Sequence, residues 1–226
     1  HEKQIAYDSK VAPTYNSDRE NEEHWSKENE FIANYFIGEN TGTILDIPVG
    51  TGRFLKYYPA NTKIYGVDIS PHMIIEAQKE ADRLHKRNVQ FDLGDAANPS
   101  SISNNSIDTI ICCRLLHLVG TDDRIRFLQE FSRILKGKLI LQLYIDKPKK
   151  GLFFRACSKA IRTLQNLMSP PQKNITPWSH IKSYGLSEID LCELLQRANM
   201  CIVARFTICS YFDSNVVMLT LRNNSK

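Results

Sequence analysis

The chain has 226 residues, which corresponds to one domain, with or without a small subdomain, at roughly 150 residues per domain. Its 42% hydrophobic and 24% charged residues are typical of a globular protein and exclude a disordered, collagen-like or coiled-coil chain. The net charge of +4 is spread along the sequence, so we expect no nucleic-acid partner. No run of about 18 apolar residues is present, and we therefore expect no membrane-spanning helix.

The predicted elements begin in a polar N-terminal segment, residues 1–40, which contains a broken helical pattern over 22–36. Apolar runs typical of strands then begin at 43, 63, 89, 107 and 138. Thr121 is expected to cap the helix that precedes the fifth run, and Gly137 is expected to end that helix. Near-continuous apolar strands that alternate with amphipathic helices predict a parallel sheet covered on both faces.

The alternation of strand and helix patterns stops in residues 145–185. We interpret this segment as an insertion beside the sheet because it is too long for a plain connection. Ser187 and Asp190 have the spacing of a capping box at the start of the last helix. Two apolar runs, 201–208 and 215–222, lie six residues apart and predict an antiparallel hairpin. The sequence therefore predicts an α/β fold with a doubly wound, seven-stranded mixed sheet, six strands parallel and one antiparallel.

The cysteine spacing favours core residues over a metal site, because none of the cysteines forms a C-x-x-C pair and most lie in apolar runs. We expect them to be reduced in a cytoplasmic protein, with no zinc site. The chain begins with His1 and shows no signal peptide, so it either carries a tag remnant or is a fragment of a longer polypeptide. The six cysteines are Cys112, Cys113, Cys157, Cys192, Cys201 and Cys209.

The strongest chemical signal is the stretch from Leu45 to Arg53, LDIPVGTGR, at the first turn from strand to helix. Ligands bind at this edge of a doubly wound sheet, and glycines without a Cβ allow a ligand to lie on the backbone. Asp68 ends the second strand, where its carboxylate is able to accept hydrogen bonds from both hydroxyls of a ribose. Asp95 follows the third strand and is able to accept from an exocyclic amine of adenine. The alternatives are a tight structural turn and acids in solvent at loop ends.

These residues resemble the first motif and strand-end acids of the class I S-adenosylmethionine-dependent methyltransferases, over about residues 40–145. Pro48 replaces the first glycine of the family's motif. A dinucleotide-binding fingerprint fits less well, because its third glycine position is occupied by Leu55. The resemblance implies cofactor contacts from Tyr15, Asp46, Pro48, Gly50, Gly52, Arg53, Asp68, Ile69, Met73, Asp95, Ala96, Cys113 and Arg114.

The segment after the fourth strand resembles the R-x-L-H stretch of small-molecule methyltransferases, and His117 in it is the candidate general base, with local packing as the alternative. Arg114 is expected either to hold an anionic substrate or to fix the cofactor site, and a structural ion pair is the alternative. The faces of Tyr7 and Tyr15 are able to cover a sulfonium by cation–π attraction. The candidate substrate residues are Tyr7, Trp25, Trp178 and His180.

The resemblance implies a helical lid over 1–40 and a methyltransferase domain over 41–226, in which 145–185 lies on the substrate side. We expect methyl transfer from S-adenosylmethionine to a small or medium-sized acceptor, with O, N and C nucleophiles all open. A catalytically silent cofactor-binding partner subunit and an RNA or protein methyltransferase are the alternative functions. The oligomeric state and the acceptor are not specified by the sequence.

Overall fold

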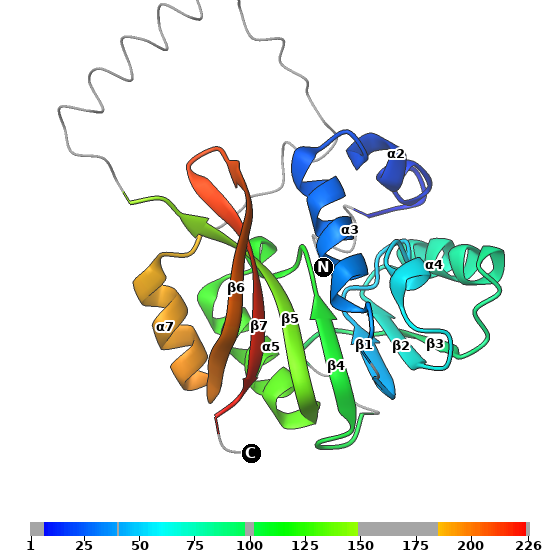
Figure 1. Ribbon diagram of the computed structural model, residues 1–226. Helices are drawn as coiled ribbons and strands as arrows, with labels where there is room; N and C mark the ends of the chain where they lie inside the picture. The colour runs from blue at the N-terminus through cyan, green and yellow to red at the C-terminus, as the bar shows by residue number, and fades with distance from the viewer. Residues whose placement is uncertain (1–6, 40, 98–101, 149–184, 225–226) are drawn as a thin grey trace, which may run out of the picture.

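The computed structural model describes residues 7–39, 41–97, 102–148 and 185–224. Its centre is a seven-stranded sheet in the order β3-β2-β1-β4-β5-β7-β6 (Figure 1). Strand β7 is antiparallel to both of its neighbours, and every other pairing in the sheet is parallel, as predicted. The strands are β1 (Thr43–Asp46), β2 (Lys63–Asp68), β3 (Val89–Leu93), β4 (Ile107–Cys112), β5 (Leu135–Asp146), β6 (Met200–Tyr211) and β7 (Ser214–Asn223).

Helices cover both faces of the sheet because successive residues of the buried strands point to opposite sides. On β4, for example, Ile110 packs in a core that also contains side chains of α5 and α7. Its neighbour Ile111 packs in a second core with side chains of α3 and α4. The helices are α2 (Tyr15–Arg19), α3 (Glu23–Tyr35), α4 (Pro71–Arg83), α5 (Thr121–Ile134) and α7 (Glu188–Arg197), with short 3-10 turns at Ala12–Thr14, Leu55–Tyr57 and Leu116–Leu118.

Helix α5 differs from the prediction at both of its ends, including its junction with β5. Gly120 is the N-cap of α5 in extended conformation, and Thr121 is the first helical residue, without a side-chain cap. The helix ends at Ile134 and β5 begins at Leu135, three residues before the expected start at 138, so Gly137 lies inside the strand. A Cβ on Gly137 would collide with the carbonyl oxygen of Asp108, so this glycine permits close approach of β4 at a register shift rather than ending a helix.

The last helix and hairpin follow the prediction with one change. Ser187 accepts from the backbone N–H of Asp190 at 3.1 Å, and the carboxylate of Asp190 accepts from the N–H of Ser187, which confirms the capping box. Strands β6 and β7 are longer than predicted and are joined by two residues rather than six. The shorter connection arises because the ladder continues to the pair formed by Tyr211 and Ser214.

The five described cysteines are free, but they are not all core residues as predicted. Cys112, Cys113 and Cys209 are buried, whereas Cys201 is half-buried on the edge strand β6 and Cys192 is exposed on α7. The apolar helical pattern of α7 places 191, 194 and 195 inward, and position 192 therefore faces outward. Cys157 and the helix predicted within the 145–185 insertion lie outside the described residues. Among the helices of the described ranges, none is long and apolar enough to cross a membrane.

Candidate functional site

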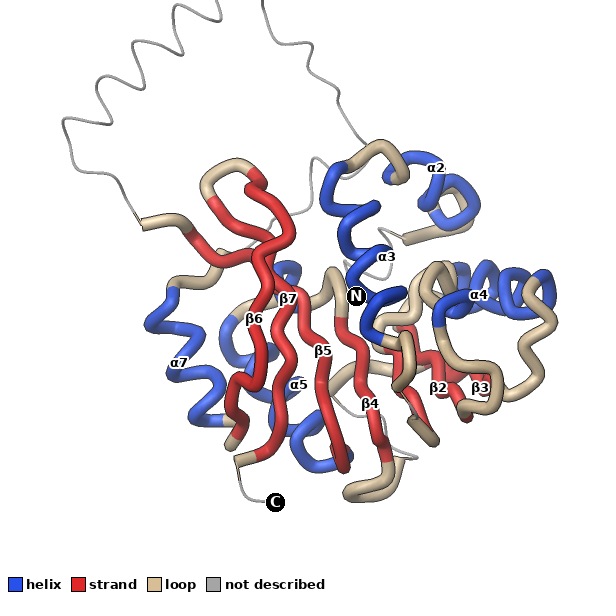
Figure 2. Tube along the Cα trace, viewed as in Figure 1, coloured by secondary structure: helices blue, strands red, loops and turns tan. Residues whose placement is uncertain are grey.

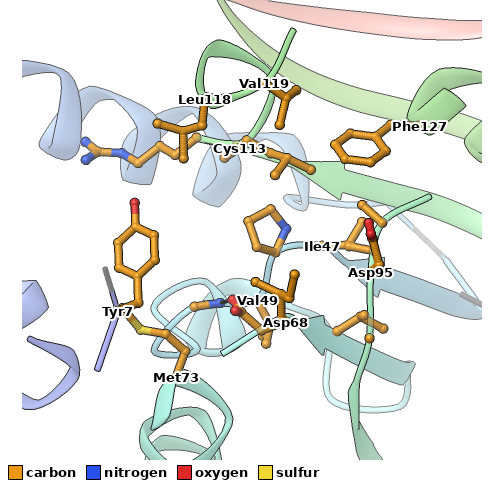
Figure 3. A pocket seen from close by; sticks show the side chains of 18 of the residues that line it. Tyr7, Ile47, Val49, Asp68, Met73, Asp95, Cys113, Leu118, Val119 and Phe127 are labelled. Atoms are coloured by element: carbon orange, nitrogen blue, oxygen red, sulfur yellow. Dashed lines mark hydrogen bonds between the residues drawn. The ribbon is translucent and has the colours of Figure 1, made fainter. Parts of the chain in front are cut away.

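A cavity of about 560 Å³ lies at the carboxyl ends of β1, β2, β3 and β4 (Figure 3). Strand order reverses between β1 and β4, so the cavity occupies the switch point at which open α/β sheets bind ligands. Figure 2 shows α2 on the side of the sheet at which β4 ends. The lining residues that the sequence predicted are Tyr7, Tyr15, Pro48, Gly50, Arg53, Asp68, Ile69, Met73, Asp95, Ala96, Cys113 and Arg114.

The two glycines of the first turn have different structural roles. Gly50 has a φ of +55°, and its N–H donates to Oδ2 of Asp68 at 2.9 Å. A Cβ on Gly50 would meet no atom within 4 Å, so this glycine keeps the cavity wall open. Gly52 has a φ of +75° and does not line the cavity. A Cβ there would lie 2.8 Å from Leu55 and 3.2 Å from the backbone of Ala77, so Gly52 allows the turn to pack against α4.

Asp68 is fixed at the centre of the cavity wall. Its Oδ2 accepts from the N–H of Gly50 and its Oδ1 from the N–H of Ser70, each at 2.9 Å. Burial raises the pKa of Asp68 above its usual value, and backbone hydrogen bonds from Ser70, Gly50 and Ile69 act in the opposite direction. Each carboxylate oxygen retains a second lone pair. Asp68 is therefore an oriented acceptor that faces the cavity.

The two ends of the cavity differ in chemistry. Asp95 and Phe127 lie at one end and Tyr7 at the other (Figure 3). Asp95 is exposed at the rim, where its Oδ1 accepts from the N–H of Ala97 at 2.9 Å. Ala96 beside it is buried and Ile69 is partly exposed, which together give this end an apolar wall with an acid at its edge. This arrangement suits a flat heterocycle with a hydrogen-bond donor on its edge.

The N-terminal segment closes the other end. The rings of Tyr7 and Tyr15 lie edge to face with centroids 5.9 Å apart, and both line the cavity. The carbonyl of Tyr7 accepts from Oγ of Ser70 at 2.6 Å, and Oγ1 of Thr51 donates to Oδ1 of Asn16 at 2.7 Å. Burial raises the pKa of the Tyr7 phenol above its usual value, so the ring stays neutral. Polar contacts therefore join this segment to the loops after β1 and β2.

Arg114 begins the loop after β4 with a φ of +60°, a conformation that residues other than glycine rarely adopt. Its N–H donates to Oε1 of Gln142 at 2.8 Å, which holds the backbone in place. Burial alone would lower the pKa of Arg114, but the nearby carboxylate of Glu28 raises it, so the guanidinium stays charged. The neighbouring thiol of Cys113 has a raised pKa because it is buried, and it remains neutral.

Four predicted site residues lie outside the cavity lining. Asp46 is buried behind the first turn, where it accepts from the Tyr58 hydroxyl at 2.7 Å and where burial raises its pKa to about 7. Gly52 packs against α4, as described above, and the Trp25 ring contacts the guanidinium groups of Arg53 and Arg114. His117 packs on Tyr144 with ring centroids 4.7 Å apart, and burial lowers its pKa to about 3.

Trp178 and His180, the remaining predicted substrate residues, lie outside the described residues. Helix periodicity did not single out Phe127, which is buried and lines the cavity. The lining residues that the sequence interpretation missed are Ile47, Val49, Thr51, Phe54, Val67, Gly94, Leu115, Leu118, Val119, Asp123, Arg126 and Phe127. Most are apolar, and several lie in the loops that follow strands, a position that signals the ligand-binding edge.

The fold and the cavity define an α/β protein that binds a ligand at the switch point of its sheet. Residues 44–138 match a family model described as a methyltransferase domain. Over this segment the chain is similar to the class I S-adenosylmethionine-dependent methyltransferases.

Two curated relatives are similar over part of their length. Thiol S-methyltransferase TMT1B of Rattus norvegicus is 26% identical over 163 residues, which cover 67% of this chain and 63% of the relative. Thiol S-methyltransferase TMT1A of Homo sapiens is 28% identical over 120 residues, which cover 51% of this chain and 48% of the relative. The chain thus spans less than two thirds of the length of these relatives.

Solved structures share the fold at low identity. Magnesium protoporphyrin IX methyltransferase ChlM from Synechocystis, with bound SAH, superposes with a TM-score of 0.67 at 16% identity and covers 97% of both chains. The [4+2]-cyclase SpnF superposes with a TM-score of 0.63 at 16% identity, covering 87% of this chain and 80% of its own. A cyclase with this fold shows that the fold by itself does not specify methyl transfer.

Proposed function

We propose that this protein transfers a methyl group from S-adenosylmethionine to a small or medium-sized acceptor. The observation that carries the proposal is the cavity at the switch point, in which the oriented carboxylate of Asp68 lies between an apolar end and a tyrosine-lined end. A nucleoside with a flat base, a ribose diol and a charged tail matches that order of surfaces.

The residues present fit this cofactor. The free lone pairs of Asp68 are placed to accept from the two ribose hydroxyls, and Ile69, Ala96 and Phe127 offer apolar contact to a base. Asp95 at the rim is suited to an exocyclic amine. We assign the tail to the end lined by Arg53 and Arg114 because cations there are suited to a carboxylate.

Within this proposal the cofactor supplies a methyl group on a sulfonium, which is already activated for displacement. The protein then contributes mainly alignment and exclusion of water, and orientation is worth up to about 7–11 kcal/mol in favourable cases. The rings of Tyr7 and Tyr15 are placed to shield a sulfonium and to stabilise it by cation–π attraction. We propose that residues 1–40 act as the lid of this site and that the 145–185 segment contributes to acceptor choice.

The acceptor class stays open among O, N and C nucleophiles, and the thiol S-methyltransferase names of the two relatives add sulfur to that set. None of the described histidines lines the cavity, so the proposal favours an acceptor that needs little help in losing a proton. We further propose a small-molecule partner and a cytoplasmic location, because the described cysteines are unpaired, which is usual for a protein of a reducing compartment.

Calorimetry with S-adenosylhomocysteine tests the cofactor assignment. We expect the wild-type protein to bind it and the Asp68→Ala variant to bind it at least a hundredfold more weakly, since two hydrogen bonds to a charged group are worth about 3–6 kcal/mol. Asp92→Ala, an acid on β3 that does not line the cavity, is the matched control. Absence of binding to the wild type, or binding indifferent to Asp68→Ala, would refute the assignment.

Transfer of a labelled methyl group to a panel of thiols, amines and phenols then tests the activity. Turnover of one class identifies the acceptor chemistry. Tight cofactor binding without turnover of any class supports a cofactor-binding partner subunit instead.

A further inference from the structure

A fully buried carboxylate, Glu28, connects helix α3 to both arginines of the cavity wall. Its Oε2 accepts from Nη2 of Arg53 and, at 3.0 Å, from Nε of Arg114. Its Oε1 accepts from Nε2 of Gln142 at 3.1 Å, and Gln142 in turn accepts from the backbone N–H of Arg114 at 2.8 Å. One carboxylate therefore fixes the side chains of both arginines and, through Gln142, the strained backbone of Arg114.

Trp25, one turn before Glu28 on the same helix, contacts both cations. The Cζ atom of Arg53 lies 3.9 Å from the centroid of the Trp25 ring, and the Cζ atom of Arg114 lies 4.8 Å from it. Guanidinium groups at such distances are attracted to the ring quadrupole. Helix α3 therefore supplies both the counterion and an aromatic contact for the two guanidiniums.

The donors of Arg114 are only partly used. Nε is bound by Glu28 and Nη1 by Glu22 at 3.2 Å, whereas Nη2 is buried and has no hydrogen-bond partner among the described residues. A buried donor without a partner costs about 1–3 kcal/mol, so such groups occur where a ligand completes them. Arg114 lines the cavity at the end closed by the N-terminal segment.

The two carboxylates beside these arginines, Glu28 and Glu22, are both ionised at neutral pH. Burial would raise the pKa of Glu28, but Arg114 and Arg53 hold it below its usual value. Burial likewise would raise the pKa of Glu22, which a hydrogen bond from His24 and the charge of Arg114 hold at about 2. Both carboxylates are therefore ionised at neutral pH, and both guanidiniums keep their counterions.

We propose that Glu28 is a positioning residue that aims the guanidiniums of Arg114 and Arg53 at the carboxylate of the cofactor's amino-acid end. The inference rests on the proposed function, because it assigns a ligand group to one end of the cavity. It makes α3 part of the cofactor site although Glu28 itself does not reach the cavity.

Two ligands that differ only at that end test the proposal by calorimetry. S-adenosylhomocysteine carries the amino-acid group, and 5′-methylthioadenosine has the same nucleoside without it. We expect Glu28→Gln and Glu28→Asp to weaken S-adenosylhomocysteine binding at least tenfold and to leave 5′-methylthioadenosine binding within twofold. Glu30→Gln, an exposed acid on the same helix, is the matched control and should change neither affinity.

The remaining outcomes separate the possible failures. Equal weakening of both ligands by Glu28→Gln, or no weakening, would show that Glu28 only supports the fold. Tighter binding of S-adenosylhomocysteine by Glu28→Gln would show that Glu28 merely offsets charge, and would also overturn the positioning role. Wild-type protein that binds neither ligand would refute the proposed function instead.

A second variant keeps the test decisive if Glu28 substitutions fail to fold, as judged by circular dichroism. Glu22→Gln removes the carboxylate bound to Nη1 of Arg114, and the Glu22 side chain is 25% exposed, so the fold should tolerate it. We expect a two- to fivefold loss of affinity restricted to S-adenosylhomocysteine. Unchanged selectivity between the two ligands in this variant would overturn the inference.

Discussion

Alanine at each glycine of the first turn separates local strain from steric packing. Gly50 and Gly52 both have positive φ, which costs alanine about 1–2 kcal/mol. Only at Gly52 would the new Cβ meet close atoms, 2.8 Å from the Leu55 side chain and 3.2 Å from the Ala77 backbone. Overpacking adds about 1–3 kcal/mol, so Gly52→Ala should lower the free energy of unfolding by about 2–5 kcal/mol in total.

Urea unfolding measured by circular dichroism is the assay for this pair. Gly50→Ala should lower the midpoint by the strain term alone, while its methyl group enters the cavity and weakens S-adenosylhomocysteine binding. Gly120→Ala, with negative φ and open space around the new Cβ, is the control and should lower the midpoint less than either turn variant, because it changes only the N-cap of α5. Equal midpoints for Gly50→Ala and Gly52→Ala would refute the packing argument.

Three further predictions follow from the described contacts. Because the pKa of Asp46 is raised to about 7 in the fold, its contribution to stability falls as pH rises from about 4 to 7. The free energy of unfolding of Asp46→Asn, measured by urea titration, should therefore increase relative to that of the wild type by about 2–4 kcal/mol across that range. A difference that stays constant with pH would contradict the assignment. Ser187→Ala should cost about 1 kcal/mol because it removes the acceptor for the N–H of Asp190, and thermal unfolding unchanged within 1 °C or so would speak against the cap. His117→Asn should leave S-adenosylhomocysteine affinity within twofold since the ring packs on Tyr144 outside the cavity lining, whereas a tenfold loss would return His117 to the site.

Local sequence signals were sufficient for most of the sheet. The apolar runs at 43, 63, 89 and 107 coincide with the observed starts of β1 to β4, because a strand buried on both faces requires an unbroken apolar run. The prediction was wrong at Gly137, because glycine is favoured both at the end of a helix and where two strands approach closely. Only the position of β4 beside it distinguishes the two.

Glu28 illustrates a site residue that lay outside the sequence interpretation. Its spacing from Trp25 and Ile32 places it on the buried stripe of α3, so an acid within an apolar helical face was a visible signal. What the acid binds was not visible, because its partners Arg53, Arg114 and Gln142 are 25, 86 and 114 residues away. Contacts at such separations depend on how the layers pack.

The sequence by itself determined the α/β fold of this protein and the edge of the sheet that carries the cavity, because buried strands leave long apolar runs and the glycine turn and acids follow their carboxyl ends. Asp68 and Asp95, which the sequence predicted at strand ends, therefore line the cavity. Tertiary structure decided which neighbouring residues face the ligand and which face the core. It placed Asp46 and His117 outside the cavity lining and brought Glu28 of α3 to the arginines, because the contacts that hold these side chains join different elements of the fold.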